Sequence, residues 1–106
     1  MKLVAIDFET ADYAPDSACA LGIVSIENGK ITKEGYGLIR PPRNRFVFSY
    51  LHGITWTDVK GKPSFIEVWD DFDDFFCGAD YFVAHNAPFD RRVLLACLAR
   101  ARRKPL

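Results

Sequence analysis

Two acidic residues stand two positions apart where an apolar segment near the start of the chain ends. Asp7 and Glu9 follow Leu3-Val4-Ala5-Ile6, and residues two apart on a strand project from the same face. Two carboxylates that point the same way repel each other unless a proton or a cation relieves the repulsion. Hard oxygen ligands favour Mg²⁺ or Mn²⁺ over zinc, so the pair indicates a divalent-cation site. An ordinary pair of acids leaving a strand for solvent is the alternative.

A third acid, Asp90, follows a second short apolar segment, Tyr81-Phe82-Val83-Ala84. If that segment forms a strand beside the first, all three carboxylates gather at the sheet edge where open α/β sheets bind their ligands. An acid in the first turn of a helix is also stabilised by the helix dipole, with no catalytic role. The dipole does not explain why three acids converge at adjacent strand ends, and that convergence favours the metal site.

The first half of the sequence predicts three strands, over residues 2–8, about 20–27 and about 30–39. Asn28-Gly29 predicts a type I′ hairpin between the second and third, because that turn needs positive φ at both central positions. The apolar run of the first strand indicates a central strand covered on both faces. Residues 41–62 are expected to be irregular, with short helical turns.

The second half predicts a helix over about 65–77, a short buried strand at 81–84 and a helix from Pro88 to about 103. Ser64 and Glu67 form a capping box at the start of the first helix, and Gly78 is placed to end it. Its aromatic residues recur at helical spacing and are expected to face the core: Phe65, Trp69, Phe72 and Phe76. The order β-β-β-α-β-α makes the fourth strand parallel to the first.

Composition limits the classes that the chain can belong to. A chain of 106 residues with 49% hydrophobic residues forms one domain with a real core. No apolar stretch reaches the roughly 18–20 residues that cross a bilayer, so no membrane partner is expected. Three scattered cysteines indicate reduced thiols in the cytoplasm. The net charge is zero and predicts no nucleic-acid partner by itself, although residues 91–106 hold six bases and no acid.

The residues around the three acids resemble a known family. Asp7-Phe8-Glu9-Thr10 and His85-Asn86-Ala87-Pro88-Phe89-Asp90 are similar to the first two motifs of the DEDDh 3′→5′ exonucleases, the family of the polymerase III epsilon subunit and RNase T. Three further segments resemble the family at matching places: Ser17-Ala18-Cys19-Ala20-Leu21-Gly22, Glu27-Asn28-Gly29-Lys30-Ile31 and His52-Gly53-Ile54-Thr55. The resemblance covers nearly the whole chain.

The resemblance implies an α/β, ribonuclease H-like mixed sheet and release of nucleoside monophosphates from the 3′ end of a single-stranded nucleic acid. It implies two divalent cations, Mg²⁺ or Mn²⁺, about 3.5–4 Å apart. Asp7 would bridge both ions, Glu9 would bind the one that activates water, and Asp90 would serve the other. The implied substrate-binding residues are Phe8, Thr10, His85, Asn86 and Phe89.

The family's third motif, a histidine with an aspartate five positions later, does not occur after Asp90. In the family, the histidine of this motif is the general base and the aspartate is the fourth metal ligand. Neither His52 nor His85 is expected to replace that histidine as the base. We therefore expect the N-terminal portion of an exonuclease domain, without the last strand and helix, that hydrolyses little or nothing by itself. The unpaired edge of the fourth strand indicates a homodimer or a swapped assembly.

Two other functions remain open from the sequence. A shortened relative could grip nucleic-acid ends without cutting them, although a pure binder has no need of three converging carboxylates. Another ribonuclease H-like nuclease would share clustered acids, but it would not be expected to carry the segment from His85 to Asp90. The choice between DNA and RNA depends on contacts to the 2′-hydroxyl, which the sequence does not place.

Overall fold

Three strands from the first third of the chain form an antiparallel meander: β1 (Lys2–Thr10), β2 (Ala18–Glu27) and β3 (Lys30–Leu38). The computed structural model describes residues 1–103. Asn28 and Gly29 connect β2 to β3 with φ values of 51° and 80°. Both values are positive, as the predicted type I′ turn requires.

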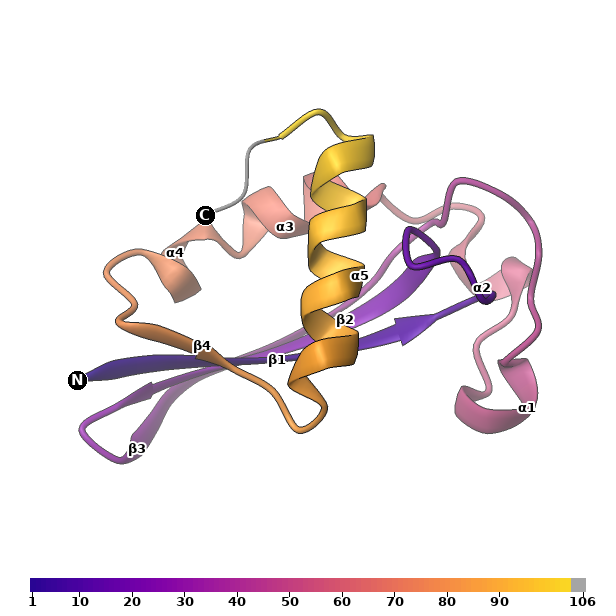
Figure 1. Cartoon of the computed structure of the whole chain (residues 1–106). Coiled ribbons are helices and arrows are strands. Elements are labelled where there is room, and N and C mark those ends of the chain that lie inside the picture. The colour runs from indigo at the N-terminus through magenta and orange to yellow at the C-terminus, as the bar shows by residue number, and fades with distance from the viewer. Residues whose placement is uncertain (104–106) are drawn as a thin grey trace.

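The fourth strand, β4 (Tyr81–Val83), pairs in parallel with β1 and gives the sheet order β3-β2-β1-β4. The chain then turns into α5 (Ala87–Arg100), which crosses the sheet in Figure 1. The prediction of a mixed sheet with the first strand inside is confirmed. Because β1 and β4 run the same way, the end of β1 and the start of α5 lie at the same end of the sheet.

Four short helices connect β3 to β4: α1 (Ser49–His52), α2 (Trp56–Val59), α3 (Phe65–Asp71) and α4 (Asp73–Phe76). The capping box of Ser64 and Glu67 is present at the start of α3. The prediction of one helix over 65–77 is wrong, because the helix breaks at Phe72. Aspartate is a poor helix former, and like charges four residues apart, as at Asp70 and Asp74, destabilise a helix.

The core lies between one face of the sheet and the helices α3, α4 and α5. Val4, Ile6 and Phe8 of β1 are buried on this face, while Leu3 and Ala5 on the other face are only half-buried. The prediction of a strand covered on both faces is therefore wrong for the described residues. After the break at Phe72, Phe75 belongs to the same core cluster as Phe65 and Trp69.

The prediction that residues 81–84 form a buried strand is also wrong. Tyr81, Phe82 and Val83 remain 59%, 38% and 39% exposed. Their strand lies at the edge of the sheet, and no other strand within residues 1–103 pairs with its outer side. The last helix ends at Arg100, three residues before the predicted end. Among the described residues, no helix is both long and apolar enough to cross a membrane.

Candidate active site

Asp90 joins the start of α5 to the end of β1. Its Oδ1 accepts a hydrogen bond of 2.9 Å from the backbone N–H of Phe8, and the residue is only 2% exposed. Pro88 lies in the first turn of α5, where a missing N–H costs no hydrogen bond, and Asp90 follows in the same turn. The bond places a carboxylate from residue 90 against the strand segment that carries the other two acids.

The environment of Asp90 raises the pKa of its carboxyl. Burial is the largest cause, the hydrogen bond from Phe8 opposes it, and the negative charge of Asp7 raises the pKa further. The two carboxylates therefore interact electrostatically although 83 positions separate them in the sequence. No described residue donates a hydrogen bond to the second oxygen of Asp90, Oδ2, so this oxygen is free to bind another group.

Asp7 and Glu9 leave the face of β1 opposite the core, Asp7 exposed and Glu9 half-buried. The structure brings all three acids to one end of the sheet, but it does not gather them into a finished cluster. Within residues 1–103, no three His, Cys, Asp or Glu side chains are arranged so that they could hold a metal ion as they stand. The ligand set of Asp7, Glu9 and Asp90 therefore stays a prediction.

The donor chemistry near the three acids fits a hard cation. Carboxylate oxygens are the ligands that Mg²⁺ and Mn²⁺ prefer. The thiol of Cys19 has its pKa raised to about 12, mainly by burial and then by the charge of Glu9. It stays protonated at neutral pH and offers no thiolate to a soft metal.

A pocket of about 230 Å³ opens beside Glu9, whereas Asp90 lines a separate groove along β4. It is lined by residues from β1, α1 and α5: Phe8, Glu9, Thr10, Phe48, Leu51, His52 and Phe89. Three of the predicted substrate-binding residues, Phe8, Thr10 and Phe89, therefore line one cavity with Glu9. Sequence reasoning missed Phe48 and Leu51, because nothing in an irregular segment indicates which of its apolar residues face a pocket.

His52 holds the wall of this pocket to the end of β1. Its Nδ1 accepts a hydrogen bond from the N–H of Ile54 at 3.0 Å, so the proton is on Nε2, which donates to the carbonyl of Thr10 at 2.9 Å. Both ring nitrogens are used in this arrangement, and neither is available to take a proton from water. His52 therefore has a structural task, and the expectation that it is no general base stays a prediction, which these two hydrogen bonds support.

His85 and Asn86 do not line the pocket, and both are exposed. The carbonyl of Asn86 accepts hydrogen bonds from the N–H groups of Phe89 and Asp90, both at 3.0 Å, and so begins α5. His85 is the smallest of the causes that act on the pKa of Asp90, and it lowers that pKa. Both residues are predicted to bind substrate, but neither lies in the pocket that Phe8, Thr10 and Phe89 line.

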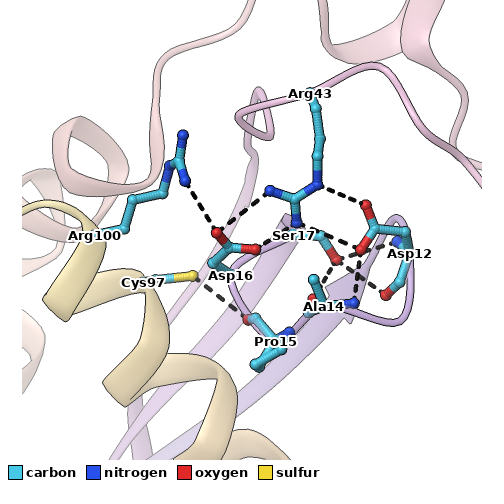
Figure 2. Close-up of polar contacts among 8 residues, drawn as sticks. All are labelled: Asp12, Ala14, Pro15, Asp16, Ser17, Arg43, Cys97 and Arg100. Atoms are coloured by element: carbon cyan, nitrogen blue, oxygen red, sulfur yellow. Dashed lines mark hydrogen bonds and ion pairs between the residues drawn. The ribbon is translucent and has the colours of Figure 1, made fainter.

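An ion-pair cluster ties two loops and α5 together (Figure 2). The guanidinium of Arg43 binds Asp12 through Nε at 3.0 Å and also pairs with Asp16, and Arg100 of α5 reaches Asp16 at 3.2 Å. The side chain of Asp12 is fully buried. Its second stabilising contact is a 2.7 Å hydrogen bond from the N–H of Ala14. We call these four charged residues the Arg43 clamp.

The Arg43 clamp fixes the segment that ends in the pocket wall. The N–H groups of Val47 and Phe48 both donate to the carbonyl of Ala11, at 2.8 and 3.3 Å. The rings of Tyr13 and Phe48 also meet edge to face, with centroids 4.9 Å apart. The loop after β1 and the loop before α1 thus form one unit, which determines where Phe48 lies in the pocket that Glu9 lines.

Known proteins resemble this chain in both sequence and fold. A DNA polymerase III of the PolC type from Thermotoga petrophila is 38% identical over 94 residues, which are 86% of this chain and 7% of that protein. A DNA polymerase III subunit epsilon from Rickettsia felis is 31% identical over 114 aligned residues, covering 100% of this chain and 49% of that protein. The chain thus spans half or less of the length of these relatives.

A solved structure of exonuclease X in complex with 5′ overhanging duplex DNA superimposes with a TM-score of 0.73 at 34% sequence identity. The match covers 86% of this chain and 52% of that one. The mixed sheet with its helices therefore has the ribonuclease H-like fold of exonucleases. The model of an exonuclease family matches residues 4–106, nearly the whole sequence, and the chain belongs to this exonuclease family.

Proposed function

We propose that this chain is the N-terminal portion of a 3′→5′ exonuclease domain and that Asp7, Glu9 and Asp90 hold two divalent cations, Mg²⁺ or Mn²⁺. The observation that carries the proposal is the hydrogen bond from Phe8 to Asp90, which fixes a buried carboxylate beside the two acids of β1. Bound there, the cations would supply an activated water and stabilise the oxygens of an in-line displacement at phosphorus.

The residues of the pocket would position the end of the nucleic acid. Phe8, Phe89, Phe48 and Leu51 offer apolar surface in the same cavity as Glu9. Bases stack on aromatic side chains without regard to sequence, and each stacked base contributes about 1–3 kcal/mol. We place the 3′-terminal nucleotide in this pocket, near the backbone of Thr10, with the Tyr13–Phe48 pair available to the next base.

The test measures binding and cleavage separately. A fluorescent single-stranded oligonucleotide with a free 3′ end should bind the chain when Mn²⁺ is present. Its affinity should fall at least tenfold when EDTA removes the cation, or when Asp7→Asn removes a ligand. An oligonucleotide with a 3′-phosphate is the matched control and should bind more weakly. Equal binding with and without the cation, or to free and blocked ends, would contradict the proposal.

Cleavage distinguishes the exonuclease from an end-binding module. Because no histidine follows Asp90 in the sequence, we expect the 106-residue chain to bind ends and to release nucleotides very slowly. Stepwise shortening of DNA or RNA from the 3′ end by a longer form of the protein, and its loss in Asp7→Ala, would identify the exonuclease. Metal-dependent binding without shortening by such a form would identify a non-catalytic module.

We also propose that the exposed edge of β4 lets two copies of this chain associate, as a homodimer or a swapped assembly. An unpaired strand edge is a template for pairing, and a groove of about 330 Å³ lies beside it, lined by Phe82, Val83 and Leu94 among others. Sedimentation velocity should detect a dimer that Val83→Lys disrupts. Ile31→Lys, on the other edge strand, is the control and should leave it intact, and a monomer at all concentrations would refute the assembly.

The cellular setting belongs to the same proposal. The described part of the chain contains three free cysteines and no disulfide, and two of the thiols, Cys19 and Cys97, are buried. Thiols remain reduced in the cytoplasm, so we place the protein there. Labelling of all three thiols in unfolded protein taken directly from cells would agree with this location, and an oxidised pair would contradict it.

A further inference from the structure

The pairing of β1 with β2 contains an irregularity at its end, beside the pocket that Glu9 lines. Glu9 lies opposite Ala20 of β2, but Thr10 lies opposite Ala18. Cys19 is thus left without a partner on β1. An extra residue of this kind forms a β-bulge, which bends the strand and changes the direction in which nearby side chains point. The bulge therefore affects the direction in which Glu9 leaves the end of β1.

The ring of His52 contacts both strands at this bulge. Its Nε2 lies 2.9 Å from the carbonyl oxygen of Thr10 and 3.9 Å from Sγ of Cys19. Thr10 is only 7% exposed, and a buried carbonyl that lacks a hydrogen bond costs free energy. Because a bulge interrupts the hydrogen bonds between the strands, a donor from outside the sheet stabilises the chain at this point.

A second hydrogen bond fixes the orientation of the His52 ring. Gly53 ends α1 with a φ of 76°, which favours glycine, and the N–H of Ile54 then donates to Nδ1 of His52 at 3.0 Å. Since a backbone N–H can only donate, Nδ1 carries no proton, and the proton of the neutral ring is on Nε2, where it faces the bulge. Ile54 is itself buried in one cluster with Cys19. The residue that orients the ring therefore packs against the bulge that the ring contacts.

Glu9, Thr10 and His52 line the same pocket, and Leu51 of α1 lines it beside them. We infer that His52 is a positioning residue for the bound end of the nucleic acid. Its Nε2–H holds the carbonyl of Thr10, and with it the direction of Glu9 and the place of α1 in the pocket wall. This role rests on the proposed function of the pocket. Groups that orient metal ligands from the second layer typically change affinity or activity by about 10- to 100-fold when they are removed.

Two substitutions of His52 separate its two hydrogen bonds. The short amide of His52→Asn can accept from the N–H of Ile54, as Nδ1 does, but it cannot reach Thr10. The longer amide of His52→Gln places an N–H near the position of Nε2, so it keeps the bond to Thr10 and loses the one to Ile54. In Mn²⁺, the affinity of the full chain for the oligonucleotide with a free 3′ end should fall about tenfold or more in His52→Asn and stay close to wild type in His52→Gln. Each variant loses one hydrogen bond, so their melting temperatures should fall by similar amounts, and a role in stability alone would weaken binding equally in both.

A second measurement detects the contact without metal or nucleic acid. Nitrogen-15 magnetic resonance spectra of the imidazole should show a proton on Nε2 of His52 and none on Nδ1. The amide nitrogen of Ala11, which shares a peptide group with the carbonyl of Thr10, should shift in His52→Asn and much less in His52→Gln. Wild-type affinity in His52→Asn, equal losses in the two variants, or a proton on Nδ1 would overturn the role of His52 alone. Absence of Mn²⁺-dependent binding by the unaltered chain would overturn the proposed function of the pocket as well.

Discussion

At the scale of single residues, the contact between Asp90 and Phe8 does two things. It joins the last helix, α5, to the first strand, β1, and it gives the buried backbone N–H of Phe8 a hydrogen-bond acceptor. The same carboxylate is proposed to bind a cation through its other oxygen. Oδ1 therefore stabilises the fold, and Oδ2 is proposed to bind the cation. Different substitutions of Asp90 can separate these two contributions.

Asp90→Ala leaves the N–H of Phe8 without a partner, and we expect this variant to lose about 1–3 kcal/mol of unfolding free energy. Asp90→Asn keeps an amide oxygen as acceptor and should lose clearly less, while it still weakens Mn²⁺ binding. Urea denaturation of both variants measures the difference. Equal stability of Asp90→Ala and Asp90→Asn would mean that the hydrogen bond does not support the fold.

The close contact between β3 and α3–α4 needs the absence of side chains at Gly35 and Gly37. A methyl group at Gly35 would lie 2.8 Å from Cε1 of Phe72 and 3.0 Å from Cζ of Phe75. Gly35→Ala should therefore destabilise the protein by about 1–3 kcal/mol, as overpacked cores do. Gly61→Ala is the control, since a methyl group there meets nothing within 4 Å. Thermal unfolding of the two variants should give clearly different melting temperatures.

At the scale of elements, the Arg43 clamp connects the loop after β1 with the loop before α1 and with α5 (Figure 2). Breaking a buried ion pair from one side costs about 3–5 kcal/mol. Arg43 is 36% exposed, so we expect a smaller loss in Arg43→Met, roughly 2 kcal/mol at neutral pH. Arg45→Met removes an exposed arginine two residues away and should change stability by less than about 0.5 kcal/mol.

The clamp also predicts how stability depends on pH. The hydrogen bond from Arg43 is the main cause that lowers the pKa of Asp16 below its ordinary value of 3.8. A carboxyl with a lowered pKa in the folded state stabilises the fold above its unfolded pKa, and this contribution is lost as the pH falls through the folded value. The stability difference between wild type and Arg43→Met should therefore shrink below about pH 3.8. A constant difference between pH 7 and pH 2.5 would contradict this.

The elements also explain what could be predicted from the sequence. The Asn28-Gly29 hairpin and the Ser64–Glu67 capping box are local devices, and both are present as expected. The break at Phe72 was not foreseen, because the aromatic spacing continued through it while the aspartates opposed the helix. The exposure of β4 depends on what lies beside its outer edge, which an apolar run of three residues does not reveal.

The candidate site divides in the same way. Asp7 and Glu9 were found from a spacing of two on a strand, and Asp90 from its place after a parallel strand. Phe48, Leu51 and the task of His52 were missed, because long-range hydrogen bonds to Ala11 and Thr10 place them.

At the scale of the whole molecule, a ribonuclease H-like sheet brings distant acids to one end of two parallel strands, where we propose that a cation binds. The most direct test is the loss of backbone amide signals in nuclear magnetic resonance spectra as Mn²⁺ is added, because a bound paramagnetic ion broadens signals close to it. We predict that the amides of Asp7, Glu9 and Asp90 broaden first. Broadening that begins in the acidic run of Asp70–Asp74, with these three amides unaffected, would contradict the proposed cation site.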